Sequence, residues 1–437
     1  MARPPSPRVA LGILTGVNLL NYVDRYMPSA VLPSIIAALH ISDAEAGALQ
    51  TLFIVTYMLM SPVAGWLGDR RPRFQLAALA VLLWSAATFG SGLAPTFLTL
   101  VLMRSLIGVG EAGYSVVTPS LLSDFYPPAR RGRALSIFYA AIPVGTALGY
   151  VIGGQVDARL GWRWAFFVAG APGAILALVL LVLRDPERGV LDRIDGGPHT
   201  SEGAGPTEGA ADDSAAKPAG ATAEPVRGAR ALLAALVRRR SWVVNTAAQT
   251  IFTFTVGGLG AWMPTYFVRI RALSLKQATT GFGGVLLLAG FVGTLVGGRV
   301  GDRLALRRSD GHFLMSGIAL VASAPFTLIA LLAPTPLVYW PAMFVTLTLL
   351  FLTTGPLNAA MANVLDAGLR GRGFALNTLG IHLLGDALSP WLIGVASGRI
   401  GLRLPVLAIA LFPIAAGLLL LAGRSALRRD LLAQAAA

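Results

Sequence analysis

The amino-acid sequence predicts an all-α membrane protein with twelve transmembrane helices arranged as two pseudo-symmetric six-helix bundles. Three observations predict this fold class: the composition is strongly apolar, one long polar segment divides the chain near its middle, and two short motifs each occur once per half. Of the 437 residues, 55% are hydrophobic and only 13% are charged. Soluble domains carry about 25% charged residues, so lipid must be the solvent for most of this chain.

Twelve apolar stretches are long enough to cross a bilayer, whose core of about 30 Å needs about 20 helical residues. The first stretch is longer than a signal peptide, contains Asp24 and Arg25 and has no small-residue cleavage site, so we expect it to remain as a helix. In chain order the stretches are 9–39, 44–68, 74–93, 96–124, 133–158, 163–183, 241–268, 277–303, 311–333, 335–365, 373–399 and 403–423.

A segment rich in Gly, Pro, Ala and acidic residues separates the sixth stretch from the seventh. Such a composition cannot bury enough apolar surface to fold. We therefore expect an N-terminal bundle at 1–184, a flexible cytoplasmic linker at 185–240 and a C-terminal bundle at 241–437.

The two halves repeat one another in local sequence. GWLGDR from Gly65 recurs as GRVGDR from Gly298, and RRGRAL from Arg130 recurs as LRGRGFAL from Leu369. The Gly-Asp-Arg copies and the Arg-Gly-Arg copies are separated by nearly the same number of residues. A duplicated six-helix unit explains both spacings.

The formal charge of +14 would suggest a nucleic-acid partner in a soluble protein, but here the placement of the charges matters more than their sum. Most lysines and arginines fall in the terminal segments, the linker and alternate loops. The positive-inside rule therefore predicts that both termini are cytoplasmic, in a plasma membrane such as the bacterial inner membrane, with no nucleic-acid partner. The chain has no cysteine, which excludes disulfides and thiolate metal sites.

No enzymatic motif is present in the sequence. A Walker A loop, a zinc motif and a serine-hydrolase elbow are all absent, so we expect neither an enzyme nor a cofactor or metal site. GVGEAG from Gly108 matches the dinucleotide fingerprint, but no strand precedes it and the helix around it has transmembrane length. Its glycines are expected to allow close helix packing instead.

Several motifs resemble those of the major facilitator superfamily, and the resemblance covers nearly the whole chain apart from the linker. The loop after the second stretch resembles the family's loop 2–3 signature, with Pro72 where a glycine is usual, and GWRWAFF from Gly161 resembles the usual opening of the sixth helix. The matching signature residues are Gly65, Leu67, Asp69, Arg70 and Arg73 in the loop, and Arg104, Gly108 and Gly110 in the fourth stretch.

Three further motifs narrow the resemblance to the Spinster branch: NYVDRY from Asn21, GVGEAGYS from Gly108 and HLLGDALSP from His382. Drug/proton antiporters of the superfamily read GxxxGPxxGG in the fifth helix, whereas this chain has Tyr150 in place of the proline. The Spinster resemblance implies transport of lysophospholipids or phosphorylated sphingoid bases, with proton coupling proposed for some members.

Charged side chains inside the first stretch are candidates for the mechanism, because a charge at mid-bilayer costs about 2.5–3.5 kcal/mol on insertion scales. Asn21, Tyr22 and Arg25 belong to a polar stripe at helical spacing, which is expected to face a water-filled cavity, and Asp24 lies at the edge of the stripe. We expect Asp24 to carry a proton and Arg25 to bind an anionic headgroup. The alternative is a structural ion pair.

The fourth stretch carries a second charged face. Arg104, Glu111 and Thr118 are seven residues apart, with Tyr114 beside them. Arginine grips phosphate or carboxylate in a bidentate manner, and a glutamate in a low-dielectric cavity can titrate near neutral pH. We expect Glu111 to carry a proton and the other three residues to contact substrate; the alternative is that Arg104 only neutralises Glu111 or Asp24.

The C-terminal half offers fewer charges. In the eleventh stretch His382 and Asp386 are four residues apart, a pair that suits either a proton relay or a structural hydrogen bond. The seventh and tenth stretches contain no charge in their apolar spans. Neutral polar residues there and in the eleventh stretch are expected substrate contacts, which would suit an amphiphile whose tail lies toward this half. They are Asn245, Gln249, Asn358 and Asn377.

The repeated loop motifs predict a cytoplasmic gate. The two Gly-Asp-Arg aspartates are expected to pair with arginines of the Arg-Gly-Arg loops only when the cytoplasmic side is shut, which the superfamily resemblance implies would favour the outward-open state. Alternatively, the arginines are present only because cytoplasmic loops carry an excess of positive charge. The gate residues are Asp69, Arg70, Arg131, Arg133, Asp302, Arg303, Arg370 and Arg372.

The sequence and the resemblance together predict a secondary active transporter, proton-coupled and monomeric, that moves lysophospholipid- or sphingolipid-like amphiphiles by alternating access. Its expected partners are the substrate, protons and the surrounding membrane lipids. One alternative is a transporter of small organic anions or hydrophobic drugs on the same scaffold. Another is a membrane sensor that transports nothing.

Overall fold

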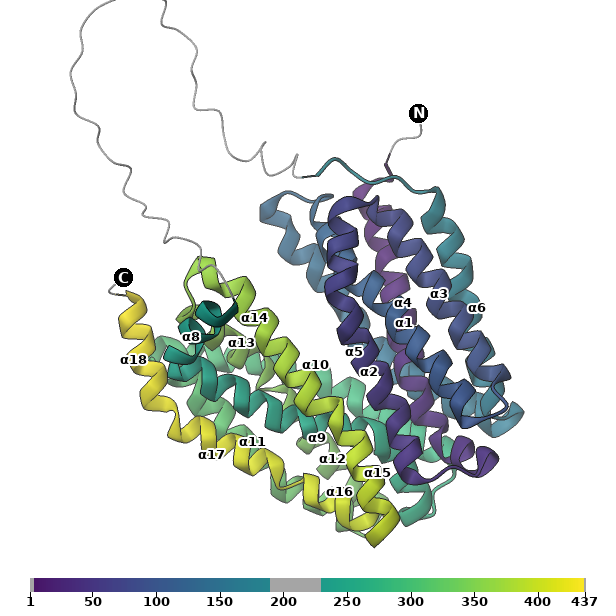
Figure 1. Ribbon diagram of the computed structural model, residues 1–437. Helices are drawn as coiled ribbons and strands as arrows, with labels where there is room; N and C mark the ends of the chain where they lie inside the picture. The colour runs from purple at the N-terminus through teal and green to yellow at the C-terminus, as the bar shows by residue number, and fades with distance from the viewer. Residues whose placement is uncertain (1–3, 189–228, 436–437) are drawn as a thin grey trace, which may run out of the picture.

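The computed structural model describes residues 4–188 and 229–435, in which every regular element is a helix (Figure 1). The first bundle comprises α1 (Pro7–Leu39), α2 (Asp43–Arg70), α3 (Arg73–Leu93), α4 (Phe97–Ser123), α5 (Pro128–Leu160) and α6 (Trp162–Val182). The second comprises α9 (Arg240–Arg271), α10 (Leu275–Arg307), α11 (Gly311–Leu332), α12 (Pro336–Phe351), α13 (Thr354–Val364), α14 (Ala367–Ile381), the π-helix η1 (His382–Asp386), α15 (Leu388–Ile400), α16 (Arg403–Ile409) and α17 (Phe412–Ala422).

Twelve membrane crossings account for these helices. Eleven of the described helical segments have the length and apolarity of a membrane span. The twelfth crossing is α1, a helix of 33 residues whose apolar surface is interrupted by Asp24 and Arg25. The observed helices follow the predicted stretches to within a few residues at most ends, so the predicted twelve-helix fold is confirmed.

Three crossings of the second bundle are interrupted, and each interruption lies four residues before a proline. Proline lacks the N–H that would bond to the carbonyl four residues earlier, and its ring clashes with that carbonyl. The carbonyls concerned belong to Leu352, Asp386 and Ile409. The helix ends at or next to the first and third of them, and around the second it widens into the π-helical turn η1.

The repeat seen in the sequence is also present in the helix starts. At the start of α2 the Ser42 side chain accepts a hydrogen bond from the N–H of Glu45, and the Glu45 carboxylate accepts one from the N–H of Ser42. Ser274 and Gln277 form the same capping box at the start of α10. Each box satisfies two N–H groups that the helix leaves unpaired.

The glycines of GVGEAG bring α4 against two neighbouring helices. A Cβ atom at Gly108 would lie 2.6 Å from the carbonyl oxygen of Phe53 on α2, and one at Gly110 would lie 2.7 Å from the carbonyl oxygen of Ala80 on α3. Any side chain at these positions would push the helices apart. The motif therefore serves helix packing, not nucleotide binding.

Both ends of the predicted linker are structured. Asp185 and Arg188 contact the loop between α2 and α3, as described below, and residues 229–238 form the helix α8 (Ala229–Arg238). A further helix that the sequence did not predict, α18 (Arg424–Ala435), follows the last crossing. Residues 189–228, the remainder of the predicted linker, lie outside the described residues.

The third helix of each bundle, α3 or α11, is held at its start by an ion pair to the segment after the sixth crossing. The acid and the base have exchanged sides between the two bundles. Asp185, which follows α6, accepts hydrogen bonds from the N–H (2.6 Å) and Nε (3.4 Å) of Arg73 at the start of α3. At the start of α11 the acid is Asp310, and the bases come from α18: Arg424 Nε at 2.6 Å and Arg428 Nη2 at 2.7 Å. Each bundle thus fastens its third helix to the segment after its sixth.

Asp310 should contribute measurably to stability. Its burial alone disfavours ionisation, but hydrogen bonds from Arg428, Arg424 and Arg308 outweigh this and lower its pKa to about 2. The resulting stabilisation is present in full above about pH 4, the ordinary pKa of aspartate, and is lost as the pH falls through about 2. We expect Asp310→Asn to destabilise the protein by about 2 kcal/mol at neutral pH, measured by thermal unfolding in detergent, and less at acidic pH. The exposed Asp302→Asn is the control, and equal melting temperatures for wild type and Asp310→Asn would contradict the assignment.

Candidate substrate and proton site

An ion pair between α1 and α4 forms the centre of the candidate site. Arg25 Nη2 lies 2.6 Å from Glu111 Oε2, and Arg25 Nε lies 2.9 Å from the same oxygen. The Glu111 side chain is fully buried, whereas 17% of the Arg25 side chain is exposed. The polar stripe of α1 therefore meets the charged face of α4, and Arg25 is the group through which solvent reaches the pair.

Arg104 lies in the same cluster without an ion-pair contact to Glu111. Its side chain is buried, and its Nη2 donates a hydrogen bond to Gln50 Oε1 of α2 at 3.0 Å. Its Nε and Nη1 have no hydrogen-bond partner among the described residues. The direct partner of Glu111 is therefore Arg25. Arg104 also interacts electrostatically with Glu111 and Asp24, so its role as a substrate contact and the alternative of a neutralising charge both stay predictions.

Asp24 turns away from Arg25 toward α3. The Thr88 hydroxyl lies 3.4 Å from Asp24 Oδ2, and both residues are buried. Asp24 Oδ1, Glu111 Oε1 and both amide atoms of Asn21 lack hydrogen-bond partners among the described residues. Buried polar atoms without partners are costly and uncommon, so this cluster is where a proton, water or a polar ligand group would complete the bonding.

Aromatic rings surround the Arg25 guanidinium. Its Cζ lies 4.9 Å from the ring centroids of both Tyr22 and Tyr57 and 5.4 Å from that of Phe53. Cations over aromatic faces are stabilised by the ring quadrupole. Sequence reasoning missed Gln50, Phe53 and Tyr57, because α2 contains no charge in its apolar span and its rotation toward α1 and α4 is not readable from hydropathy.

Tyr114 and Thr118, predicted to contact substrate, use their hydroxyl groups in hydrogen bonds to backbone carbonyls, Tyr114 on another helix and Thr118 within α4. Both are fully buried. The Tyr114 hydroxyl donates a hydrogen bond to the carbonyl oxygen of Leu14 on α1 at 2.5 Å, and its ring packs edge-on against Trp84 of α3. The Thr118 hydroxyl bonds to the carbonyl oxygen of Tyr114. In this structure both side chains are therefore buried where α4 packs against its neighbours, and a substrate contact at either one stays a prediction.

The neutral polar residues of the C-terminal half lie on α9, α13 and α14. Asn245 Nδ2 donates a hydrogen bond to the carbonyl oxygen of Leu357 at 3.0 Å, which ties α9 to α13 next to the half-buried Asn358. Asn245, Gln249 and Asn377 are buried, and each has one polar atom without a hydrogen-bond partner among the described residues. Both bundles thus contain buried polar atoms without hydrogen-bond partners among the described residues, although the charged cluster lies in the first bundle.

His382 and Asp386 are joined as their spacing suggests, within the π-helical turn η1. His382 Nδ1 lies 2.9 Å from Asp386 Oδ2, and the two side chains are 38% and 22% exposed. A Cβ atom at Gly257 would lie 2.5 Å from the Cβ of Asp386, so the turn packs tightly on α9. The hydrogen bond is present; its use as a proton relay stays a prediction.

The arginines of the Arg-Gly-Arg repeat hold helix ends. Arg131 Nε donates to the carbonyl oxygens of Ser123 at 2.9 Å and Tyr126 at 3.0 Å. Arg370 Nε donates to the carbonyl oxygen of Ala362. The acceptor lies eight residues before the arginine in both copies, since Ser123 also lies eight residues before Arg131. The last carbonyls of a helix lack partners within it, so the first arginine of each copy satisfies the end of the preceding crossing.

The predicted gate pairs are not formed in this structure. Among residues 4–188 and 229–435, no ion pair joins Asp69 to Arg131 or Arg133, or Asp302 to Arg370 or Arg372. The bundles diverge toward the end that carries both termini (Figure 1). The gate residues belong to the last turns of α2 and α10 and to the first turns of α5 and α14. The prediction concerned the state in which this end is closed, and for that state it stays a prediction. Of the remaining gate residues, Arg70 stacks on Trp66 at 4.2 Å and Arg303 is exposed.

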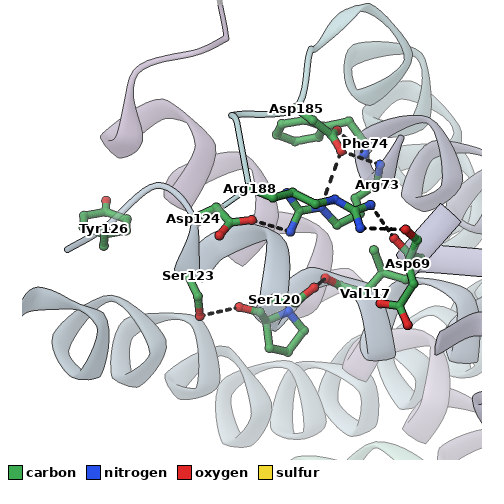
Figure 2. A network of polar contacts seen from close by, with 12 residues as sticks. Asp69, Arg73, Phe74, Val117, Ser120, Ser123, Asp124, Tyr126, Asp185 and Arg188 are labelled. Carbon is green, nitrogen blue, oxygen red and sulfur yellow. Dashed lines mark hydrogen bonds and ion pairs between the residues drawn. The ribbon is translucent and has the colours of Figure 1, made fainter. Parts of the chain in front are cut away.

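A different polar network occupies the Gly-Asp-Arg loop of the first bundle. Figure 2 shows Arg188 reaching across to this loop, where its guanidinium donates to the carbonyl oxygens of Gly68 and Asp69 at 2.7 Å each. Beside it, Arg73 Nη1 lies 2.5 Å from Asp124 Oδ2 at the end of α4. The ends of α2, α3 and α4 are thereby held together by the segment that follows α6.

The two bundles contact each other at the opposite end, where α2 and α10 begin; we call this the closed end. Arg269 Nη1 of α9 lies 2.7 Å from Asp43 Oδ1 of α2, and the Ser397 hydroxyl of α15 donates to Asp43 Oδ2 at 2.5 Å. About two turns further along α2, Thr51 donates to the carbonyl oxygen of Ala387 at 2.5 Å. Sequence reasoning did not predict this set, because its members lie at helix ends far apart in the chain.

Glycines make the closed end possible, and a side chain there should open it. A Cβ at Gly47 would lie 2.2 Å from the carbonyl oxygen of Pro390. We expect Gly47→Val to separate α2 from α15 and to increase maleimide labelling of a cysteine at Thr279, which is buried at the contact of α10 with α5, by about tenfold or more. The chain has no other cysteine. Gly398→Val, which meets nothing within 4 Å, is the control; equal labelling rates would contradict the prediction.

Known proteins share both the sequence pattern and the fold. Residues 14–390 match the model of the Major Facilitator Superfamily. The human protein spinster homolog 1 is 33% identical over 415 residues, which cover 91% of this chain and 74% of that protein. The sphingosine-1-phosphate transporter SPNS2 of Xenopus tropicalis is 32% identical over 409 residues, covering 90% of this chain and 74% of that protein.

A solved structure of a bacterial homologue of the human lysosomal transporter Spinster, in an inward-facing and unoccupied conformation, has the same fold. It superposes with a TM-score of 0.81 at 21% identity and covers 98% of this chain and 99% of that one. The relatives are membrane transporters and not enzymes, as the sequence predicts. The chain therefore belongs to the Spinster branch of the Major Facilitator Superfamily.

Proposed function

We propose that this transporter moves single-tailed anionic or zwitterionic lipids, of the lysophospholipid or sphingolipid kind, and that protons drive the cycle. The observation that carries the proposal is the Arg25–Glu111 ion pair, in which a fully buried carboxylate is balanced by an arginine that is partly exposed. An arginine keeps its charge at any physiological pH, whereas a buried carboxylate can take up a proton. The pair is therefore built to change its bonding when one proton arrives.

The proposed exchange has two steps. Protonation of Glu111 removes the charge that holds Arg25, and the guanidinium becomes available to a phosphate or carboxylate of the substrate. Loss of the proton re-forms the ion pair, which competes with the anion for Arg25 and releases it. Arg104, which has two unpartnered nitrogens among the described residues, is proposed as the second anion contact.

Two further groups are proposed to handle protons. Asp24 interacts electrostatically with Glu111 and with the fixed charge of Arg104, so its protonation is coupled to that of Glu111. In the second bundle the partly exposed His382–Asp386 pair offers a site where a proton can be exchanged with water. The buried amides of α9 and α14 are proposed to contact the polar part of the substrate.

Support for a lipid substrate comes from the relatives, one of which is named as a sphingosine-1-phosphate transporter. One observation favours the alternative of a small organic anion: the C-terminal half presents amides with unpartnered polar atoms at Asn245, Gln249 and Asn377 rather than an apolar face for a tail. The two substrates share an anionic group that Arg25 would bind, and they differ in the tail.

The transport cycle is proposed to be alternating access by a monomer in a plasma membrane, with both termini in the cytoplasm. In that orientation the structure is open toward the cytoplasm, and the Asp43–Arg269 contact shuts the outer side. The Gly-Asp-Arg and Arg-Gly-Arg residues are proposed to gate the cytoplasmic side in the other half of the cycle.

Uptake into proteoliposomes tests the proposal directly. Purified protein should take up a radiolabelled lysophospholipid when an inward proton gradient is imposed, and a protonophore should abolish the uptake. A short-chain organic acid and a hydrophobic dye serve as competing substrates. Uptake of the organic acid but not the lysolipid would favour the alternative, and binding of lysolipid without any flux would favour a sensor.

Charge-neutral variants test the coupling. We expect Asp24→Asn and Glu111→Gln each to remove gradient-driven uptake by at least about tenfold while the purified proteins remain folded. Glu187→Gln, the same change at an exposed position after α6, should transport like wild type. Undiminished uptake by both cluster variants would refute proton coupling at this site.

A further inference from the structure

Phe53 on α2 is the ring that both arginines of the cluster share. Its centroid lies 4.5 Å from the Arg104 Cζ and 5.4 Å from the Arg25 Cζ, and its side chain is almost completely buried. A buried ring interacts with a cation more strongly than an exposed one, because water does not compete. No other ring among the described residues is close to Arg104.

The position of this ring is fixed by the backbone. Gly108 of α4 brings the Phe53 carbonyl to 2.6 Å from where a Cβ would lie, and the Thr56 hydroxyl to 2.4 Å. One turn of α2 is therefore pressed against the helix that carries Glu111 and Arg104. The backbone that carries the ring is thus held next to the helix that carries Arg104.

Arg104 makes this ring contact while using few of its hydrogen-bond donors. Its only hydrogen bond among the described residues goes to Gln50, while Nε and Nη1 have none. Two guanidinium groups that share one region also repel each other. A ring quadrupole attracts both and, unlike a carboxylate, does not change its charge with pH.

We propose that Phe53 is a positioning residue of the transport site: its ring holds the Arg25 and Arg104 guanidinium groups in place, so that Arg25 stays beside Glu111 and remains available there after Glu111 binds a proton. The inference rests on the proposed function and deepens it. It assigns to α2, which carries no charge in its membrane span, the task of keeping the anion-binding groups in position while the carboxylate titrates.

The surroundings of Glu111 determine the expected sign of a pH effect. The charged or titratable groups that interact with it are Arg25, Asp24, Tyr22 and Tyr26 from α1 and Arg104 from its own helix, with Tyr57 of α2 beyond Arg25. A weaker hold on either arginine removes positive charge from beside Glu111. Its protonated form is then favoured, and the midpoint of its titration should move to higher pH.

The test is a series of fluorinated phenylalanines at position 53, with one, two and three fluorine atoms incorporated site-specifically in the full-length protein. Fluorination keeps the shape of the ring and weakens its attraction for cations step by step. We expect the lysolipid KM to rise progressively, by about tenfold across the series, and the midpoint of the protonated-carboxyl infrared band, assigned by its loss in Glu111→Gln, to rise in parallel. Phe53→Trp should retain transport and Phe53→Leu should lose it.

The same series at Phe282 is the matched control. This ring is equally buried, packs edge-on against Tyr150 and has no cation from the described part of the chain over it, so both readouts should stay constant. Equal infrared midpoints and equal KM values across the position-53 series would overturn the inference, even if Phe53→Leu is inactive, because the ring would then act by shape alone. A progressive midpoint shift without any lysolipid uptake would refute the proposed substrate and keep the positioning role.

Discussion

Replacing Arg25 by alanine should abolish transport and destabilise the protein by about 3 kcal/mol at neutral pH. Removing one partner of a buried ion pair leaves the other charge without compensation, and Glu111 has no exposure to water. The loss of stability should shrink at acidic pH, since a protonated Glu111 needs no cation beside it. Thermal unfolding of the purified protein at several pH values measures this.

The double variant Arg25→Ala/Glu111→Gln separates stability from function. Removing both partners takes away the unpaired charge, so the melting temperature should return to near the wild-type value while transport stays absent. A double-mutant cycle with the two single variants then gives the interaction energy of the pair. If Arg25→Ala unfolds no more readily than the double variant at neutral pH, the two residues do not form the buried pair seen here.

Breaking the Asp43–Arg269 contact should shift the protein toward the state in which the closed end is open. Asp43→Asn removes the negative charge that accepts hydrogen bonds from Arg269 and from Ser397. A hydrogen bond to a charged group contributes about 1.5–3 kcal/mol. We therefore expect the labelling rate of the buried cysteine at Thr279 to increase by about tenfold. Pulsed electron paramagnetic resonance between spin labels on α2 and α15 should show the distances lengthening in parallel.

The charge-swapped variant Asp43→Arg/Arg269→Asp provides the control for this contact. Each single reversal places two like charges next to each other and should open the closed end, whereas the swap restores an attractive pair and should restore slow labelling at least in part. A swapped protein that labels as fast as either single reversal would show that the ion pair does not hold the bundles together.

Much of the fold was predictable because lipid imposes a simple requirement on sequence. Each crossing needs about 20 apolar residues, and charges are expelled from the span unless they have a use, so both the twelve helices and the cluster of Asp24, Arg25, Arg104 and Glu111 could be identified. The direct partner of Glu111 could not, because the rotation of one helix against another depends on close packing at glycines such as Gly108 rather than on hydropathy.

Two side chains have partners in this structure that the sequence did not indicate. Tyr114 lies on the same side of α4 as Glu111, but there α4 packs against α1 and its hydroxyl is used by a backbone carbonyl of that helix. Likewise, the charge of Arg131 suggested an ion pair, whereas the structure uses its donors at the end of α4. Polar side chains in membrane proteins often satisfy backbone groups that water cannot reach, and a sequence alone does not show which carbonyls are unpaired.

The opposite polarity of the ion pairs at the starts of α3 and α11 has a consequence for biogenesis. After a duplication the two bundles begin as near copies, and during synthesis the tail of one is able to dock on the other. Here such an exchange would place Arg73 against Arg424 and Arg428, and Asp310 against Asp185, so each mismatched contact is repulsive. We therefore expect this polarity to favour the docking of each tail on its own half of the molecule.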